Sequence, residues 1–135
     1  MKKLLLAKEA LEAIQKGQKK LSKNDLSKIV NQSTDISKKI AAPGPLLRFF
    51  EDCKLLISII KDYTTNTYKE IPWWAISAIG FALLYVINPA DLIPDYLPII
   101  GFVDDATVIA VCLTLVEKEL LVYKAWKNKN TLKPN

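Results

Sequence analysis

The sequence predicts an all-α fold: a small helical protein with a hydrophobic antiparallel helical hairpin and an amphipathic N-terminal helical arm. Apolar residues recur at helical spacing over the first half of the chain. A run of 20 residues without a charge then extends from Ile71 to Ala90. A second apolar run, ATVIAVCLTLV, follows a stretch rich in proline and aspartate.

The composition is that of one globular domain with few of the side chains that conventional catalytic sites use. The chain has 135 residues, of which 50% are hydrophobic, so a disordered chain is excluded. There is no histidine, and Cys53 and Cys112 are far apart. This excludes the usual structural zinc sites and both Ser-His-Asp and Cys-His catalysis. We therefore expect a protein that is not an enzyme, with two buried thiols in a reducing compartment.

The charge is distributed unevenly along the chain. Residues 1–70 have 14 basic and 8 acidic side chains, residues 71–110 have no base and four aspartates, and residues 111–135 have five lysines and two glutamates. The bases are nearly all lysines and are scattered, which argues against a nucleic-acid partner. Attraction to an anionic membrane surface fits these lysines better.

The N-terminal arm is predicted to cover residues 1–43 and to contain two helices. Residues 3–21 repeat apolar side chains at helical spacing, and residues 24–41 do so more weakly. APGP at 42–45 ends the arm, because proline cannot continue a helix and Gly44 tolerates a positive φ.

The main domain is predicted at 44–130, with residues 131–135 as a flexible tail. Its first helix covers 45–63 and has a wide apolar face. The hydrophobic hairpin follows, with helices at 72–88 and 104–126. Twenty helical residues reach roughly 30 Å, which is the thickness of the hydrocarbon core of a bilayer.

The hairpin has two interpretations, a membrane insertion and the core of a soluble helical bundle. Aromatic side chains would meet one membrane interface at the same end of both helices: Trp73, Trp74, Tyr123 and Trp126. Lysines flank this end and are absent from the connection, which predicts a membrane hairpin with both termini in the cytoplasm. Glu117 and Glu119 interrupt the second helix and favour the soluble bundle in the cytoplasm.

The connection NPADLIPDYLPIIGFVDD, residues 88–105, is explained first by backbone chemistry. Its structural residues are Pro89, Pro94, Pro98 and Gly101, which end one helix and reverse the chain. Asp104 is placed to cap the next helix and Asp105 to favour its positive dipole end. Two alternatives remain open, an acidic docking surface and a divalent-cation site. The cation site would use Asp91, Asp95, Asp104 and Asp105.

The same stretch carries a resemblance. Tyr85, the run from Pro89 to Asp95, Pro98, Gly101 and the pair Asp104-Asp105 resemble the signature of the YkvA-like family, a bacterial domain of unknown function. The preceding YKEIPWW, from Tyr68, is also similar, and coverage is best over residues 46–126. Ala90 departs from the bulkier aliphatic residue common in the family. The resemblance implies a small helical protein that is often membrane-associated, and it implies no catalytic residue or cofactor.

We therefore predict a non-enzymatic, membrane-associated protein without a cofactor that anchors or modulates a protein partner. Its partners would be the lipid bilayer and that protein, and a homo-oligomer is compatible with the sequence. One alternative is a divalent-cation-binding protein or enzyme that uses the four aspartates. Another is a soluble helical adaptor or immunity-type protein whose basic arm binds an acidic partner.

Overall fold

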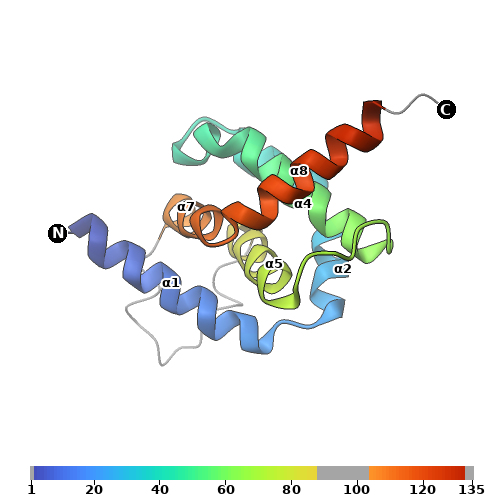
Figure 1. The fold of residues 1–135 in the computed structure, drawn as a ribbon. Helices are drawn as coiled ribbons and strands as arrows, with labels where there is room; N and C mark the ends of the chain where they lie inside the picture. The colour runs from blue at the N-terminus through green and yellow to red at the C-terminus, as the bar shows by residue number, and fades with distance from the viewer. Residues whose placement is uncertain (1, 88–103, 133–135) are drawn as a thin grey trace.

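The charge-free run forms helix α5, Trp73–Ile87, around which most of the other helices pack (Figure 1). The structure, a computed structural model, describes residues 2–87 and 104–132. The remaining elements are α1 (Lys2–Lys20), α2 (Lys23–Asn31), α3 (Ser33–Ala41), the 3₁₀ helix η1 (Pro45–Phe49), α4 (Phe50–Thr64), α7 (Asp105–Leu115) and α8 (Glu117–Leu132). Every regular element in the described ranges is helical, which confirms the all-α prediction.

Helix α5 is enclosed because it has no polar face. Its residues are buried without interruption from Ala75 to Leu83, and Tyr85 and Val86 are buried as well. A helix that is apolar all round must be covered on every side. Helices α1, α2, α3, α4 and α7 all contact it, as expected for the core of a helical bundle.

Helix α1 approaches α5 closely because of one glycine. A Cβ on Gly17 would lie 2.0 Å from the ring of Phe81, so the ring occupies the space that a side chain would take. Ala10, Ala13 and Ile14 are buried on the same helix. The predicted arm, residues 1–43, therefore contributes to the same hydrophobic core as the helices that follow residue 43.

Two predicted helices are each divided in the structure. The helix expected at 24–41 is broken at Gln32, whose backbone leaves the helical conformation (φ −104°, ψ 15°) between α2 and α3. The helix expected at 104–126 is broken at Val116 (φ −103°, ψ 13°), which is fully buried. Each break redirects the chain so that apolar residues on both sides of it reach the core.

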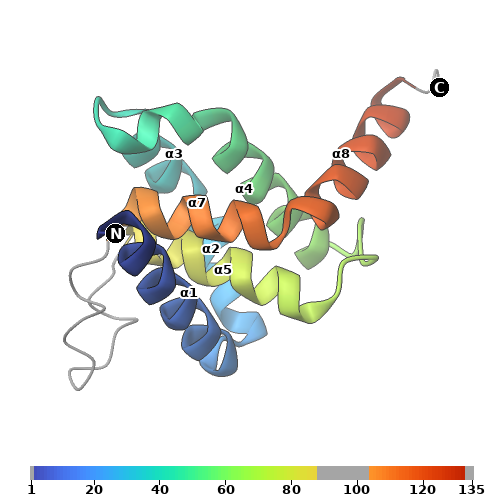
Figure 2. The ribbon, with the colours of Figure 1, turned by 60° about the vertical axis from the view of Figure 1, so that its left-hand side comes forward.

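Beyond Val116, α8 leaves the body of the protein, and its C-terminal half projects outward in both views (Figures 1 and 2). It ends at Leu132, two residues inside the tail predicted at 131–135. None of the helices in the described ranges combines the length with the apolar composition that crossing a bilayer requires.

The start of the predicted 45–63 helix is a 3₁₀ turn, and α4 begins only at Phe50. Gly44 before it has a φ of +155°, a conformation open essentially to glycine alone, as the sequence predicted. Both thiols are free and buried, and burial raises the pKa of Cys53 and of Cys112 to about 12. Neither is therefore a reactive cysteine in the folded protein.

Candidate functional site

The predicted acidic site is described only in part. Asp91 and Asp95 lie outside the described residues, as do Pro89, Pro94, Pro98 and Gly101. Asp104 and Asp105 are described, at the start of α7. The structure thus describes the end of the acidic stretch, where α7 begins beside the C-terminal end of α5.

Asp104 is the N-cap of α7, as the sequence predicted. Its backbone is extended (φ −79°, ψ 162°), and its Oδ1 accepts a hydrogen bond from the backbone N–H of Thr107 at 2.7 Å. Such a cap contributes about 1 kcal/mol to stability. This carboxylate therefore already has a structural role.

Asp105 lies in an ion pair that the sequence did not predict. The Nζ of Lys39 lies 3.6 Å from its Oδ2 and also donates to the backbone carbonyl of Val86. Lys39 thus joins α3 to the end of α5 and the start of α7. Burial raises the pKa of Asp105, while Lys39 opposes the shift and Asp104 adds to it, and burial dominates. Burial, together with Asp105 and Asp104, raises the pKa of the Tyr85 hydroxyl to about 12.

The net effect on Asp105 predicts a particular dependence of stability on pH. Because the pKa of Asp105 is raised in the folded state, the folded state binds its proton more tightly than the unfolded state does. Its contribution to stability is fully present below the ordinary value of 3.8 and is lost as pH rises through the folded pKa. As the pH rises from 3.8 through the folded pKa of Asp105, we expect the free energy of unfolding of the native protein to fall relative to that of Asp105→Asn. Above the folded pKa the difference should become constant. Urea unfolding at a series of pH values measures this difference. A difference that grows with pH would mean that Lys39, rather than burial, dominates.

The described residues hold no group of three or more histidine, cysteine, aspartate or glutamate side chains that could bind a metal ion. Asp104 and Asp105 are engaged by a backbone amide and by a lysine. The four-aspartate cation site stays a prediction, because Asp91 and Asp95 fall outside the ranges described.

The four predicted interface aromatics occupy different environments. Trp73 and Trp74, at the start of α5, are 38% and 49% exposed. Tyr123 is fully buried and Trp126 half-buried, with their rings stacked at 5.8 Å. Tyr68 packs against both rings, at 5.0 Å from Tyr123 and 4.8 Å from Trp126. Tyr123 therefore does not reach the surface of this fold, because the break at Val116 turns α8 toward α4.

A chain of hydrogen bonds between α4 and α8 holds Tyr123 in place. Its hydroxyl donates to the Oδ2 of Asp62 at 2.6 Å and lies 2.6 Å from the Oγ of Ser58. Because a phenol has one proton, Ser58 is the donor to Tyr123. Lys127 in turn donates to Ser58 and lies 3.5 Å from Asp62. Burial and the bond to Asp62 raise the pKa of Tyr123 far above its ordinary value. Sequence spacing indicated none of these partners.

Removing the hydroxyl of Tyr123 tests this network. We expect Tyr123→Phe to lower the free energy of unfolding by about 1–2 kcal/mol, because Asp62 and Ser58 lose their shared partner. The matched control is Tyr63→Phe, because the structure gives the Tyr63 hydroxyl no hydrogen-bond partner within its described ranges. Urea denaturation followed by circular dichroism measures both variants. Equal stability of the two would show that the network contributes nothing.

The exposed tryptophans form one wall of a surface hollow, which we call the tryptophan surface. It is lined by Gln15, Gln18, Lys19, Leu21, Trp73, Trp74 and Ser77. The Nε2 of Gln18 donates to the backbone carbonyl of Trp74 at 2.6 Å, which fixes the end of α1 to the start of α5. Lys69 adds a second positive charge nearby, with its Nζ 3.8 Å from the ring centroid of Tyr63, which packs on Trp73.

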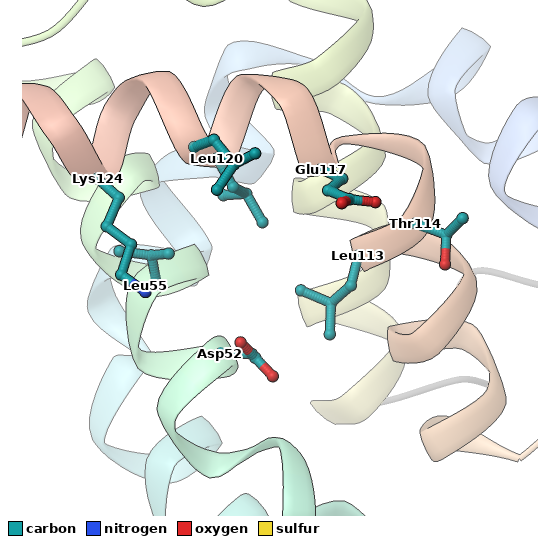
Figure 3. Close-up of a pocket in the computed structure, with 8 residues that line it drawn as sticks. Asp52, Leu55, Leu113, Thr114, Glu117, Leu120 and Lys124 are labelled. Carbon is teal, nitrogen blue, oxygen red and sulfur yellow. The ribbon is translucent and has the colours of Figure 1, made fainter.

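A smaller hollow, of about 280 Å³, lies between α4, α7 and α8 (Figure 3). Figure 3 shows Asp52 and Glu117 on two of its sides and Lys124 at another. All three side chains are exposed to solvent. The hollow therefore lacks the desolvation that usually accompanies a reaction centre.

Comparison with known proteins gives matches over the stretch that includes α5 and the start of α7. Residues 75–111, which begin within α5 and end within α7, match a family described as a protein of unknown function, DUF1232. A curated relative from Bacillus subtilis (strain 168), named "Uncharacterized membrane protein YkvA", is 33% identical over 69 residues. Over this stretch the chain is similar to YkvA. This confirms the resemblance that the sequence motifs indicated.

The YkvA relationship covers 51% of this chain and 65% of the length of the relative. The relative is named a membrane protein, and neither comparison assigns a biochemical role. No solved structure matches the chain significantly. The similarity to YkvA therefore brings no catalytic residue to this chain.

Proposed function

We propose that this YkvA-like protein is a non-enzymatic protein of the bacterial cytoplasmic membrane. It lies on the cytoplasmic face of the bilayer and anchors or modulates a protein partner there. The observation that carries the proposal is the tryptophan surface, where two large aromatic side chains are exposed beside lysine. The Bacillus subtilis relative is named a membrane protein, which supports membrane association.

Tryptophan favours the membrane interface because its ring is apolar while its N–H can stay in contact with water and headgroups. Trp73 and Trp74 are adjacent in the chain and both are exposed. Gln18 fixes the backbone that carries them. Their rings therefore have a rigid base from which to enter the headgroup region.

Lysine supplies the second contribution to binding. Lys19 lines the tryptophan surface, while Lys16 and Lys20 are exposed on the same end of α1. A lysine near an anionic bilayer contributes about 1 kcal/mol, and the effect is screened by salt. Binding through aromatic rings and lysines together needs no helix that crosses the membrane.

The four-aspartate alternative has less support, because one of its described carboxylates caps α7 and the other pairs with Lys39. The alternative of a soluble adaptor, whose basic arm binds an acidic partner, assigns no role to the two adjacent exposed tryptophans. Membrane association accounts for both the tryptophans and the lysines near them.

Sedimentation with lipid vesicles tests the proposal. We expect the protein to sediment with phosphatidylglycerol vesicles, less with phosphatidylcholine vesicles, and less in high salt. Replacing Trp73 and Trp74 together by alanine should weaken binding about tenfold or more, since a loss of 1.4 kcal/mol is already tenfold.

Leu47→Ala is the matched control, because Leu47 is 47% exposed on η1 and does not line the tryptophan surface. It should bind vesicles like the native protein. A native protein that stays in the supernatant with both kinds of vesicle would refute membrane association. Equal binding by the double variant and the native protein would assign the contact to another surface.

A further inference from the structure

A third hollow lies between α1 and α7, two helices that pack against each other (Figure 2). It is a groove of about 670 Å³, which we call the α1–α7 groove. It is lined by Ala7, Lys8, Leu11, Ala110, Val111, Thr114 and Leu115. Its size lies within the range of small-molecule sites, roughly 300–1,000 Å³.

The groove and the tryptophan surface lie along one flank of α1. Lys8, Leu11, Gln15 and Gln18 follow one another at intervals of three or four residues, so they share a face of the helix. The first two line the groove, and the last two line the tryptophan surface. A membrane that meets Trp73 and Trp74 is therefore adjacent to the groove.

The lining of the groove is apolar except at one point. The hydroxyl of Thr114 donates to the backbone carbonyl of Ala110 at 3.0 Å, so its hydrogen is already used. Ala7 and Ala110 are small, which leaves the space open. Lys8 is the one charged residue in the lining, and no acidic side chain within the described ranges forms an ion pair with it.

An apolar groove with a single positive charge at one side matches an amphiphile with a negative head. We propose that the α1–α7 groove binds one acyl chain of an anionic phospholipid, with the phosphate group at Lys8. This inference rests on the proposed membrane association, which would supply the lipid. The protein would then hold a single lipid molecule while it lies on the bilayer.

Single-chain lipids below their micelle concentration test the groove without a membrane. Lysophosphatidylglycerol should bind the native protein with 1:1 stoichiometry in calorimetry. Lysophosphatidylcholine of the same chain length should bind more weakly, and glycerophosphoglycerol, which has no chain, should not bind. Equal binding of the two lysolipids would show that Lys8 does not select the anionic headgroup. Binding of glycerophosphoglycerol would show that the acyl chain is not required.

Two variants locate the site. Lys8→Glu should weaken lysophosphatidylglycerol about fivefold or more, as expected for about 1 kcal/mol per charge, and leave lysophosphatidylcholine unchanged. Lys61→Glu, at an exposed position of α4 that does not line the groove, is the charge-matched control. Leu115→Gln should weaken both lysolipids, and because Leu115 is 37% exposed the variant should still fold. Lysolipid binding that none of these changes affects would place the site elsewhere.

The outcome of the lysolipid calorimetry can be distinguished from the outcome of vesicle sedimentation. Vesicle binding without 1:1 lysolipid binding would overturn the groove and leave membrane association intact. Lysolipid binding by a native protein that ignores vesicles would overturn membrane association, on which the source of the lipid depends. Dimerisation that Leu115→Gln abolishes, in a protein that binds no lysolipid, would assign the groove to a second copy of the chain.

Discussion

Replacing Phe81 by alanine is expected to lower the free energy of unfolding by about 3–5 kcal/mol, the usual cost of removing a fully buried aromatic side chain. Phe81 is 1% exposed, and its ring lies between α5 and Gly17 of α1. Its ring centroid is 6.0 Å from that of Tyr85. Truncation leaves a cavity at the contact that attaches α1 to the core.

Urea denaturation of Phe81→Ala should therefore show a much lower midpoint with a similar slope. Leu121→Ala is the matched control, because Leu121 is 60% exposed and should change stability by no more than about 0.5 kcal/mol. A loss below about 1.5 kcal/mol for Phe81→Ala would mean that α1 does not pack on α5 as described.

Adding a side chain on the opposite side of the same contact should also destabilise the protein. Gly17→Val is expected to cost about 3 kcal/mol through overpacking, because even a Cβ would lie 2.0 and 2.2 Å from two ring carbons of Phe81. Valine is the better helix former by only about 0.4 kcal/mol, so the clash decides the sign. Thermal or urea unfolding measures the loss.

The two substitutions should compensate each other. In the double variant Gly17→Val/Phe81→Ala, the new methyl groups occupy part of the space that the ring leaves. We expect the double variant to lose clearly less stability than the sum of the single losses. Strict additivity would show that the two positions do not touch. Stabilisation by Gly17→Val alone would contradict the close approach of the two helices.

Much of the fold follows from local sequence signals. The charge-free run predicts α5 because only a helix or strand covered by protein or lipid tolerates such composition. Asp104 was predicted as a cap because it lies two positions before the apolar run that begins at Ala106, and its Oδ1 does accept a hydrogen bond from a backbone amide of the first turn. APGP predicted a break, and Gly44 has the backbone conformation that this break requires.

The helix breaks were missed for a physical reason. Gln32 and Val116 are ordinary residues for a helix interior, and no glycine or proline marks either position. Their conformations are imposed by the packing of the segments on both sides. Because the break at Val116 was not foreseen, Tyr123 was predicted at a membrane interface, whereas the structure buries it against α4.

The partners at the two polar clusters were missed because they are distant in sequence. Lys39 meets the carbonyl of Val86, 47 positions away, and Lys127 meets Ser58, 69 positions away. Periodicity and capping rules act over a few residues and give no information on such pairs. The sequence could place Asp105 at a helix start but could not supply its lysine.

The charge-free run alone could not distinguish lipid from protein as the cover for α5. The structure shows protein on all sides of it, with Leu21, Leu26 and Ile29 around Gly80. The membrane contact that we propose is therefore at the exposed start of α5, at Trp73 and Trp74, and not along its buried length.

Quenching of tryptophan fluorescence by brominated lipids tests membrane association through the tryptophan surface most directly. In a Trp126→Phe variant, the remaining tryptophans are Trp73 and Trp74. With phosphatidylglycerol vesicles brominated near the headgroup end of the acyl chain, we predict a blue shift of the emission and strong quenching. Bromine near the chain terminus should quench weakly. Emission unchanged by vesicles to which the protein is bound would contradict the account.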